Sequence, residues 1–149
     1  MPDRIGDAAK GRQPSKGFFE ALALASDPTA SAHLINSQID GSFYDDLACM
    51  FGIASHKLLD LLNIPASVQY RWRRTQRLSV DESDYALSQA LVLREALGLF
   101  EGDKFETLEW LSRPNRALDH MAPISLLSTF AGIGIVEALI WKIENGVGI

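Results

Sequence analysis

The stretch from residue 79 to residue 102 constrains the fold more than any other part of the chain. It opens with SVDE (79–82), a capping box in which the serine and glutamate side chains satisfy free N–H groups of a first helical turn. It closes at Gly102. Between them, apolar residues alternate at spacings of four and three: Ala86, Ala90, Leu93, Leu97 and Phe100. This period predicts one long helix whose apolar seam packs in the core, on a second copy in a homodimer, or both.

Shorter segments on both sides of that helix also carry helical signals, and none alternates apolar and polar residues as a strand would. The predicted helices span residues 18–26, 31–41, 43–52, 55–63, 65–77, 103–113, 123–130 and 134–146. The first 16 residues are polar and charged and are expected to form a mobile arm. The predicted fold class is therefore all-α.

Composition indicates the cellular compartment in which the chain is expected to act. It has 149 residues, a net charge of −5 and one cysteine, Cys49, so it has no internal disulfide and a reducing compartment is expected. The N-terminal residues carry charges throughout, so we expect no signal peptide. No window approaches 18 continuous apolar residues, so we expect no membrane-spanning helix or membrane partner, and a cytoplasmic location.

Several patterns look like catalytic motifs but are better explained structurally. GIGIVE (132–137) lacks the third glycine and preceding strand of a dinucleotide-binding fingerprint, so we expect its glycines to let helices approach closely. Asp119, His120 and Ser125 do not suggest a triad, because an Asp beside a His in sequence usually points away from it. The three histidines lack metal-ligand spacing, and Cys49 lies on the apolar side of its helix. We therefore expect no enzyme, no metal and no cofactor.

Residues 43–77 follow the pattern of a helix-turn-helix. Three short helices are predicted, and Ser55 is a candidate N-cap for the second. Asn63, suited to a left-handed C-cap, and Pro65, suited to a first helical turn, mark a tight turn before the third helix. In a helix-turn-helix this third helix is the one that enters the major groove of DNA.

The third helix is rich in arginine. Val68 and Trp72 would face the core, and the opposite side would carry Tyr70, Arg73, Arg74 and Arg77. Arginine at this place binds guanine edges or phosphates, whereas the alternative is a solvated face paired with the acidic residues 81, 82 and 84 downstream. The candidate DNA-contacting residues are Ser67, Gln69, Tyr70, Arg71, Arg73, Arg74 and Arg77.

Two prolines interrupt the C-terminal third. Pro114 stops the helix over 103–113 and Pro123 starts a new one, which yields a compact lobe. The inner side of the first of these helices is expected to carry Phe105, Leu108 and Leu111. The inner stripe of the last helix is expected to be Ile133, Val136, Ile140 and Ile143. Gly146 fits the C′ position of that helix, so residues 147–149 are expected to form a free tail that can enter a partner's cleft.

One combined pattern runs through the second half of the chain. Its positions are Arg77-Leu78-Ser79, Asp81-Glu82-Ser83-Asp84, Trp110-Leu111, Pro114-Asn115, Ala117-Leu118, Pro123, Leu126-Leu127, Val136-Glu137, Leu139, Ile143-Glu144 and Gly146-Val147. With these residues the chain resembles the Xre/ParS/MbcA-type antitoxins of RES–Xre toxin–antitoxin pairs over about residues 43–149. It departs from them at residues 119–122, where such antitoxins commonly have a glycine-containing turn, and at its last two residues.

The resemblance implies an Xre-like helix-turn-helix that binds its own promoter as an autorepressor, in a homodimer. It also implies a C-terminal domain that covers the active-site cleft of a RES-domain toxin, a class thought to consume NAD⁺. The chain then divides into an arm with short helices (1–42), a DNA-binding and dimerisation domain (43–102) that includes the apolar seam, and a toxin-binding domain (103–149). The implied toxin-binding residues are Trp110, Pro114, Asn115, Pro123, Glu137, Ile140, Trp141, Glu144, Gly146, Val147, Gly148 and Ile149.

Two other functions stay open at this point. One is an Xre-type transcriptional regulator without a toxin partner, whose C-terminal domain only dimerises. The other is a regulator that senses a small molecule bound between its two lobes.

Overall fold

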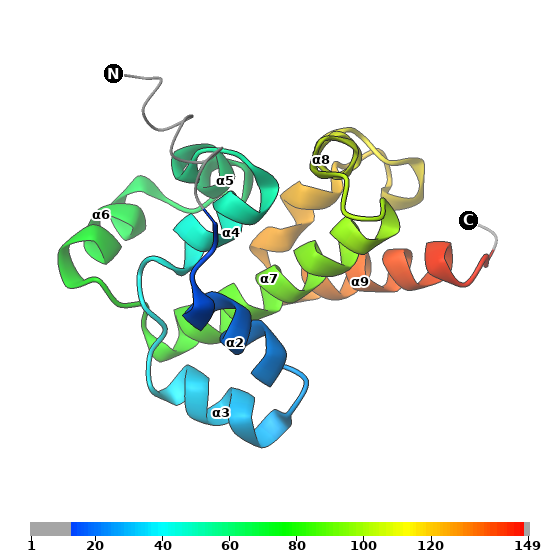
Figure 1. Ribbon diagram of the computed structural model, residues 1–149. Helices are drawn as coiled ribbons and strands as arrows, with labels where there is room; N and C mark the ends of the chain where they lie inside the picture. Colours follow the sequence, from blue (N-terminus) through cyan, green and yellow to red (C-terminus); the bar gives the residue numbers. More distant parts are fainter. Residues whose placement is uncertain (1–12, 148–149) are drawn as a thin grey trace.

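The computed structural model describes residues 13–147, which form α-helices and two short 3₁₀ segments (Figure 1). The elements are α2 (Lys16–Leu24), α3 (Pro28–Asn36), α4 (Phe43–Phe51), α5 (Ser55–Leu61), α6 (Ala66–Thr75), α7 (Val80–Leu99), α8 (Lys104–Ser112), η1 (Arg116–Leu118), η2 (Pro123–Ser128) and α9 (Phe130–Glu144). This part of the chain contains two isolated β-bridges and no strand, so the all-α prediction is confirmed. None of its helices is both long and apolar enough to cross a bilayer.

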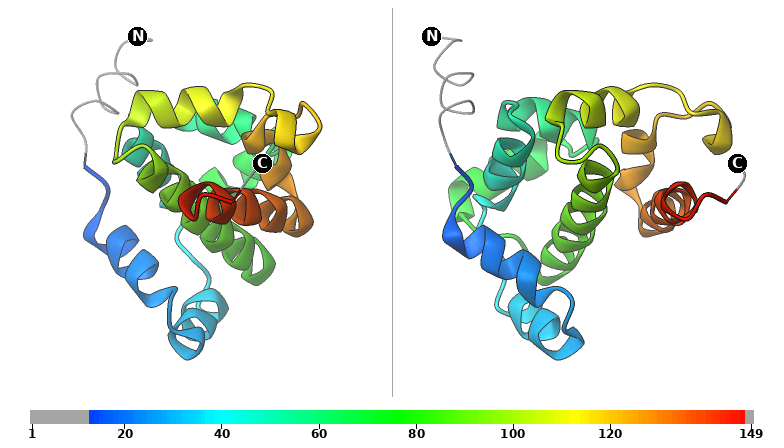
Figure 2. Two further views of the ribbon diagram at one scale, coloured as in Figure 1. Left: turned by 90° about the vertical axis from the view of Figure 1, so that its right-hand side faces the viewer. Right: turned by 45° about the vertical axis from the view of Figure 1, so that its right-hand side comes forward.

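The long helix α7 lies at the centre of the molecule, with the other helices around it (Figures 1 and 2). α2, α3 and α4 contact it from the N-terminal half of the chain, and α8 and α9 contact it from the C-terminal half. One hydrophobic core runs from Phe18 in α2 to Ile140 in α9. α7 therefore joins the parts that the sequence analysis separated at residue 102, and the three-part division stays a prediction.

The apolar seam of α7 serves this core. Ala86, Ala90 and Leu93 are at most 1% exposed in the single chain. A second copy could reach them only if the core opened, which corrects their assignment to a dimer contact. Leu97 and Phe100 are partly exposed, and Phe100 lies just past the end of α7 against Trp110, with 6.1 Å between ring centroids. These two are the seam residues that a second copy could touch.

Hydrogen bonds confirm several predicted helix ends. Ser79 Oγ accepts from the Glu82 N–H at 3.1 Å, and Glu82 Oε1 accepts from the Ser79 N–H at 2.8 Å, which completes the capping box. Asn63 and Gly146 both adopt the left-handed conformation, with φ of 59° and 65°. The residue after each of them donates its N–H back to the last helical turn, as in a Schellman motif.

The N-terminal predictions are shifted by a few residues. Ser15 is the N-cap of α2, and its hydroxyl also donates to the buried carboxylate of Asp46 at 2.7 Å, so Ser15 belongs to the fold rather than to an arm. The rest of the predicted arm, residues 1–12, lies outside the described residues. Asp27 caps α3, which ends at residue 36, so the segment 37–41 is a link and not part of that helix.

Local caps in the helix-turn-helix also differ from prediction. Ser55 is the first residue of α5, and Ala54 holds the N-cap position without a side-chain bond. Pro65 is the residue before α6 rather than its first residue, and α6 ends at Thr75 instead of continuing to residue 77.

Two apolar residues expected inside are exposed. Phe105, in the first turn of α8, is 71% exposed because it faces away from the core. The buried residues of α8 include Thr107 and Trp110 instead. Ile143 is 38% exposed, whereas Leu139 one turn earlier is buried. The spacing of apolar residues predicts which of them share a face of a helix. It does not predict at which residue along the helix the neighbouring elements stop covering that face.

The segment between α8 and α9 folds around Asn115. Its side chain accepts from the Ala117 N–H at 2.9 Å, its carbonyl accepts from the His120 N–H at 2.9 Å, and its N–H donates to the Met121 carbonyl at 3.0 Å. Asp119 and His120 both adopt positive φ, 56° and 66°, in the segment where the antitoxins that the chain resembles commonly have a glycine-containing turn. Pro123 starts the next element as predicted, but as a 3₁₀ helix.

The predicted close approach in GIGIVE is confirmed at one of its two glycines. A Cβ built on Gly132 would lie 1.7 Å from the carbonyl oxygen of Leu126, so only glycine lets α9 begin against η2. A Cβ built on Gly134 would meet no atom within 4 Å, so at that position the expectation is wrong.

Candidate functional site

Helix α6, the predicted DNA-contacting helix, is held to the rest of the molecule chiefly through Trp72, its one buried residue. The indole stacks on the ring of Tyr44 from α4, with 5.1 Å between centroids and 10° between planes. Its Nε1 donates to Glu82 Oε1 at 3.0 Å. The remaining side chains of α6 are partly or fully exposed, so a single anchor sets the position of this helix.

Glu82, at the start of α7, is the polar half of that anchor. Partial burial alone would raise the pKa of Glu82, but hydrogen bonds from Arg71, the Ser79 N–H and Trp72 outweigh it and lower the pKa to about 2. Arg71 donates to both carboxylate oxygens and forms an ion pair with them. The glutamate therefore caps α7 and fixes α6 at the same time.

The arginines predicted to contact DNA do not all lie in the same environment. Arg71 is engaged within the chain, as the alternative interpretation of the basic face proposed. Arg77 lies beyond the end of α6, and its guanidinium donates to the carbonyl of Ser37 at 3.1 Å, so its placement on the helix face is corrected. Arg73 and Arg74 stay on the exposed side of α6 with Tyr70, which is 60% exposed.

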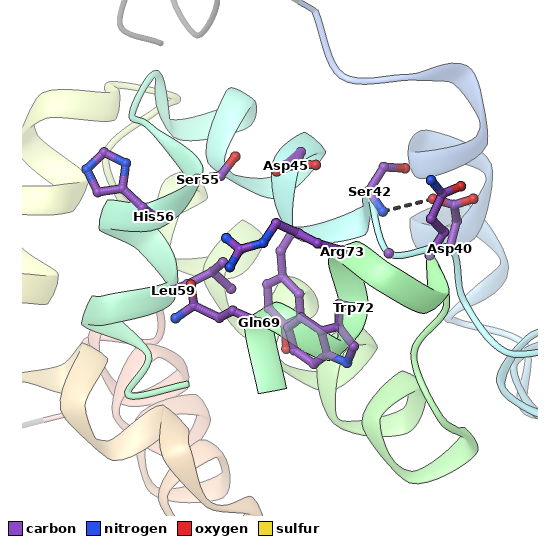
Figure 3. A pocket seen from close by; sticks show the side chains of 12 residues that line it. Asp40, Ser42, Asp45, Ser55, His56, Leu59, Gln69, Trp72 and Arg73 are labelled. Carbon is purple, nitrogen blue, oxygen red and sulfur yellow. Dashed lines mark hydrogen bonds between the residues drawn. The ribbon is translucent and has the colours of Figure 1, made fainter. Parts of the chain in front are cut away.

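Arg73 extends into a hollow of about 620 Å³ beside α6 (Figure 3). Gln69 lies next to it on the same helix, and Ser55 and His56 border the hollow from α5. The carboxylates of residues 40 and 45 line it as well, so the hollow carries both signs of charge. Arg73 and Arg74 therefore supply the exposed positive charge of α6, and Ser67 is exposed in its first turn.

A buried polar chain links the anchor of α6 to the C-terminal lobe. The Tyr44 hydroxyl donates to Gln89 Oε1 at 2.5 Å, and Gln89 Nε2 donates to the carbonyl of Leu127 in η2 at 2.8 Å. The Tyr85 hydroxyl donates to the same carbonyl at 2.7 Å. Burial of Tyr44 raises the pKa of its hydroxyl, so it stays a donor at any physiological pH. Through these bonds, Tyr44 of α4 and Tyr85 of α7 are both connected to η2 in the C-terminal lobe.

The sequence analysis missed these linking residues. Gln89 lies beside the apolar seam of a helix whose neighbours Ala86, Ala90 and Leu93 are buried. A polar side chain at such a position must find a buried partner, which is the signal that could have identified it.

The residues predicted to bind a toxin fall into two groups. Trp110, Pro123 and Ile140 are buried in the lobe, so they can shape its surface but not contact a partner directly. Exposed or partly exposed residues make up the second group: Pro114, Asn115, Glu137, Trp141, Glu144, Gly146 and Val147. Gly148 and Ile149 lie outside the described residues.

The outer face of α9 is apolar although it is open to solvent. Phe130, Ile135 and Trp141 are 54%, 51% and 58% exposed. The small residues Gly134 and Ala138 lie between them on the exposed side. Large apolar side chains exposed along one helix are typical of an interaction surface.

A cavity of about 350 Å³ lies between the helix-turn-helix and the C-terminal lobe. Its lining includes the aromatic side chains of Tyr44, Trp72, Tyr85 and Phe130. This is where the small-molecule hypothesis would place a ligand, and that hypothesis stays a prediction. Over residues 13–147 no group of three His, Cys, Asp or Glu side chains is placed to hold a metal ion.

Comparison with known proteins assigns the family. Residues 96–146 match the family described as the antitoxin Xre/MbcA/ParS C-terminal toxin-binding domain. Antitoxin Xre of Yersinia enterocolitica is 34% identical over 105 residues, which are 69% of this chain and 70% of the relative. The chain belongs to the Xre/MbcA/ParS antitoxin family. This confirms the resemblance drawn from the sequence, and the apolar face of α9 lies within the matched toxin-binding domain of this antitoxin.

Two further relatives extend the comparison. Antitoxin Xre of Photorhabdus laumondii is 37% identical to this antitoxin over 71 residues, 48% of each chain. A protein of a Sphingobium species named Prs ADP-ribosylating antitoxin is 26% identical over 147 residues, 93% of this chain and 92% of the relative. The likeness to the Sphingobium protein thus includes the N-terminal helices α2 and α3.

Proposed function

We propose that this antitoxin neutralises a RES-domain toxin by binding it through the C-terminal lobe and covering its active-site cleft. The observation that carries the proposal is the exposed apolar face of α9, with Ile135 and Trp141, inside the region that matches a toxin-binding domain. Such a face loses contact with water when a partner covers it, which stabilises the complex by about 25 cal/mol per Å² of apolar surface. The antitoxin then acts by occlusion and not as an enzyme.

The name of the Sphingobium relative supports the chemistry expected of the toxin. That protein is named for ADP-ribosylation. NAD⁺ is the general donor of ADP-ribose, so a toxin of this kind would consume NAD⁺. We propose the same class of partner for this chain.

We also propose that α6 contacts the antitoxin's own promoter and represses it. Arg73, Arg74 and Tyr70 support this, because they are exposed on α6, the third helix of the predicted helix-turn-helix. A homodimer stays part of the proposal, since helix-turn-helix proteins commonly bind paired half-sites. Its contact lies outside the buried part of the α7 seam.

The test is co-expression of the antitoxin with its toxin in cells, with growth and cellular NAD⁺ as readouts. Ile135→Glu and Trp141→Glu place a charge on the apolar face, and we expect both to abolish rescue while the antitoxin still folds, because both side chains are exposed. Phe19→Glu on α2, where the side chain is 50% exposed, is the matched control and should rescue fully. Full rescue by both α9 variants would reject this face as the toxin-binding surface.

The tail is tested separately. Val147 is 43% exposed and its N–H closes the C-terminal turn of α9 on Lys142, so deleting residues 147–149 should lower the melting temperature only slightly. We expect the deletion to weaken neutralisation more than complex formation. Full neutralisation by the shortened chain would show that the lobe itself blocks the toxin.

A further inference from the structure

A groove of about 520 Å³ lies along the exposed side of α9, and Glu95 of α7 borders it. Trp141 lines it, and the small residues Gly134 and Ala138 leave it unfilled. Apart from the adjacent residues and the backbone of α9 itself, no heavy atom lies within 4 Å of the place where a Cβ of Gly134 would stand. The groove therefore has an exposed aromatic side chain and open space beside it, within the exposed side of α9.

Three carboxylates surround this groove. Glu137 and Glu144 flank Trp141 on α9 at spacings of four and three residues, so the three side chains share one stripe of the helix. Glu95 faces them from α7. The ion pairs found over residues 13–147 involve none of these glutamates, and Lys142 is the one cationic side chain in the lining.

The glutamates act on each other unfavourably. Burial, followed by the charges of Glu137 and Glu144, raises the pKa of Glu95, and the opposing effect of Arg94 does not cancel this. A fold gains nothing from like charges gathered beside an exposed indole. They favour association only with a partner whose charge is positive.

Arginine fits this groove better than any other side chain. Its planar guanidinium stacks on an indole ring and donates to two carboxylates at once, whereas a lysine ammonium is a compact charge that does neither as well. We propose that the groove between α7 and α9 receives an arginine side chain of the toxin, stacked on Trp141 and paired with Glu137 and Glu144. This inference rests on the proposed function, because it names the chemistry of the toxin surface that the C-terminal lobe recognises.

The first experiment measures binding of the full antitoxin to purified toxin over a series of salt concentrations. The double variant Glu137→Gln, Glu144→Gln removes two charges at nearly constant size. We expect its Kd to rise roughly tenfold or more, with a weaker salt dependence, because charge-assisted hydrogen bonds are lost. The matched control is Glu106→Gln, Glu109→Gln on α8, which makes the same charge change outside the groove and should leave Kd unchanged.

The melting temperature of the free antitoxin is a second readout, and we expect it to change in the opposite direction to the toxin affinity. Removing mutual repulsion should keep or raise the melting temperature of Glu137→Gln, Glu144→Gln, although the same variant binds toxin more weakly. A purely structural role for the two glutamates would instead lower the melting temperature and affinity together, and that result would overturn the inference.

The aromatic part of the site is tested at Trp141. Trp141→Phe keeps a ring for the guanidinium, and Trp141→Leu keeps apolar area without one. We expect the Leu variant to bind toxin more weakly than the Phe variant. Equal affinities would remove the stacking contact from the proposal.

The arginine is identified by a double-mutant cycle. Each surface arginine of the toxin is changed to Ala and measured against the wild-type antitoxin and against Glu137→Gln, Glu144→Gln. One arginine should show coupling of about tenfold with the glutamates, since paired residues are not additive. Absence of coupling for every arginine would overturn the inference while leaving toxin binding, and so the proposed function, intact.

Two further outcomes are decisive. If the wild-type antitoxin binds no toxin, the proposed function fails and the inference fails with it. If light scattering shows that the two glutamate changes dissociate an antitoxin dimer while toxin affinity is unchanged, the groove is a contact between copies of this chain and the inference is wrong.

Discussion

The indole of Trp72 lies parallel to the ring of Tyr44, with 5.1 Å between their centroids and 10° between their planes. Trp72 is the buried residue of α6, and Tyr44 belongs to the buried polar chain that ends at Leu127 in the C-terminal lobe. The helix proposed to contact DNA is therefore attached to the same network as the lobe that binds the toxin. Loss of either ring should therefore loosen the attachment of α6.

Trp72→Ala should release α6. We expect the free energy of unfolding to fall by about 3–5 kcal/mol, the usual cost of truncating a buried aromatic residue. Trp72→Phe keeps a stacked ring but loses the bond to Glu82, so a loss of about 1–3 kcal/mol is expected. Chemical denaturation followed by circular dichroism measures both. Equal stability of the Phe variant and the wild type would show that the Glu82 contact contributes nothing.

Acid should weaken the attachment of α6 through Glu82. Its pKa of about 2 in the folded chain lies below the ordinary value of 4.5, so the charged form stabilises the fold above pH 4.5. This stabilisation is lost as the pH falls from about 4.5 to about 2, and amounts to at most about 3 kcal/mol. We expect wild type to exceed Glu82→Gln in stability at neutral pH and the difference to vanish near pH 2. A difference that does not change with pH would contradict the lowered pKa.

The two glycines of α9 should respond to alanine with opposite signs. Gly132→Ala forces a methyl group against the Leu126 carbonyl, so we expect a loss of at least about 1–3 kcal/mol of stability. Gly134→Ala meets open space and improves helix propensity, so a gain of about 0.5–1 kcal/mol is expected. Thermal melts of the two variants test the pair. Equal shifts would mean that α9 does not begin against η2 as described.

Arginines of α6 should separate into two classes in DNA binding. Arg73→Ala, Arg74→Ala should weaken promoter affinity and reduce its salt dependence with little change in stability, because both side chains are exposed. Arg71→Ala should mainly lower stability, because it breaks the ion pair with Glu82. Gel-shift titrations over a salt series and thermal melts distinguish these effects. Unchanged promoter affinity in the double variant would show that Arg73 and Arg74 do not contact DNA.

The seam of α7 makes a prediction about folding. Leu93→Glu buries an unpaired carboxylate in the core of the single chain, which costs several kcal/mol. We expect an unfolded or aggregated protein and not a folded monomer. Size-exclusion chromatography with circular dichroism tests this, and a well-folded monomeric Leu93→Glu would show that the residue lies in a dimer contact.

The amino-acid sequence by itself determined that the chain is helical, and it fixed several of the helix ends. The capping box at Ser79 and Glu82 and the left-handed Asn63 and Gly146 depend on side chains and backbone within a few residues of one another. The spacing of apolar residues also indicated which side of α7 is inside. These features are local, and the residues that specify them are neighbours in the sequence.

Only the tertiary structure decided which of the candidate site residues are exposed and can contact a partner. It pairs Arg71 with Glu82, buries Trp110, and exposes Phe105. The outcome at each of these positions depends on where one helix crosses another and how far it extends beyond its neighbour. Glu95 of α7 borders the same groove as Glu137 of α9, although the two residues are 42 positions apart in the sequence (137 − 95). Helical periodicity fixes directions around one axis, but the positions of the axes relative to one another come from packing of the whole core.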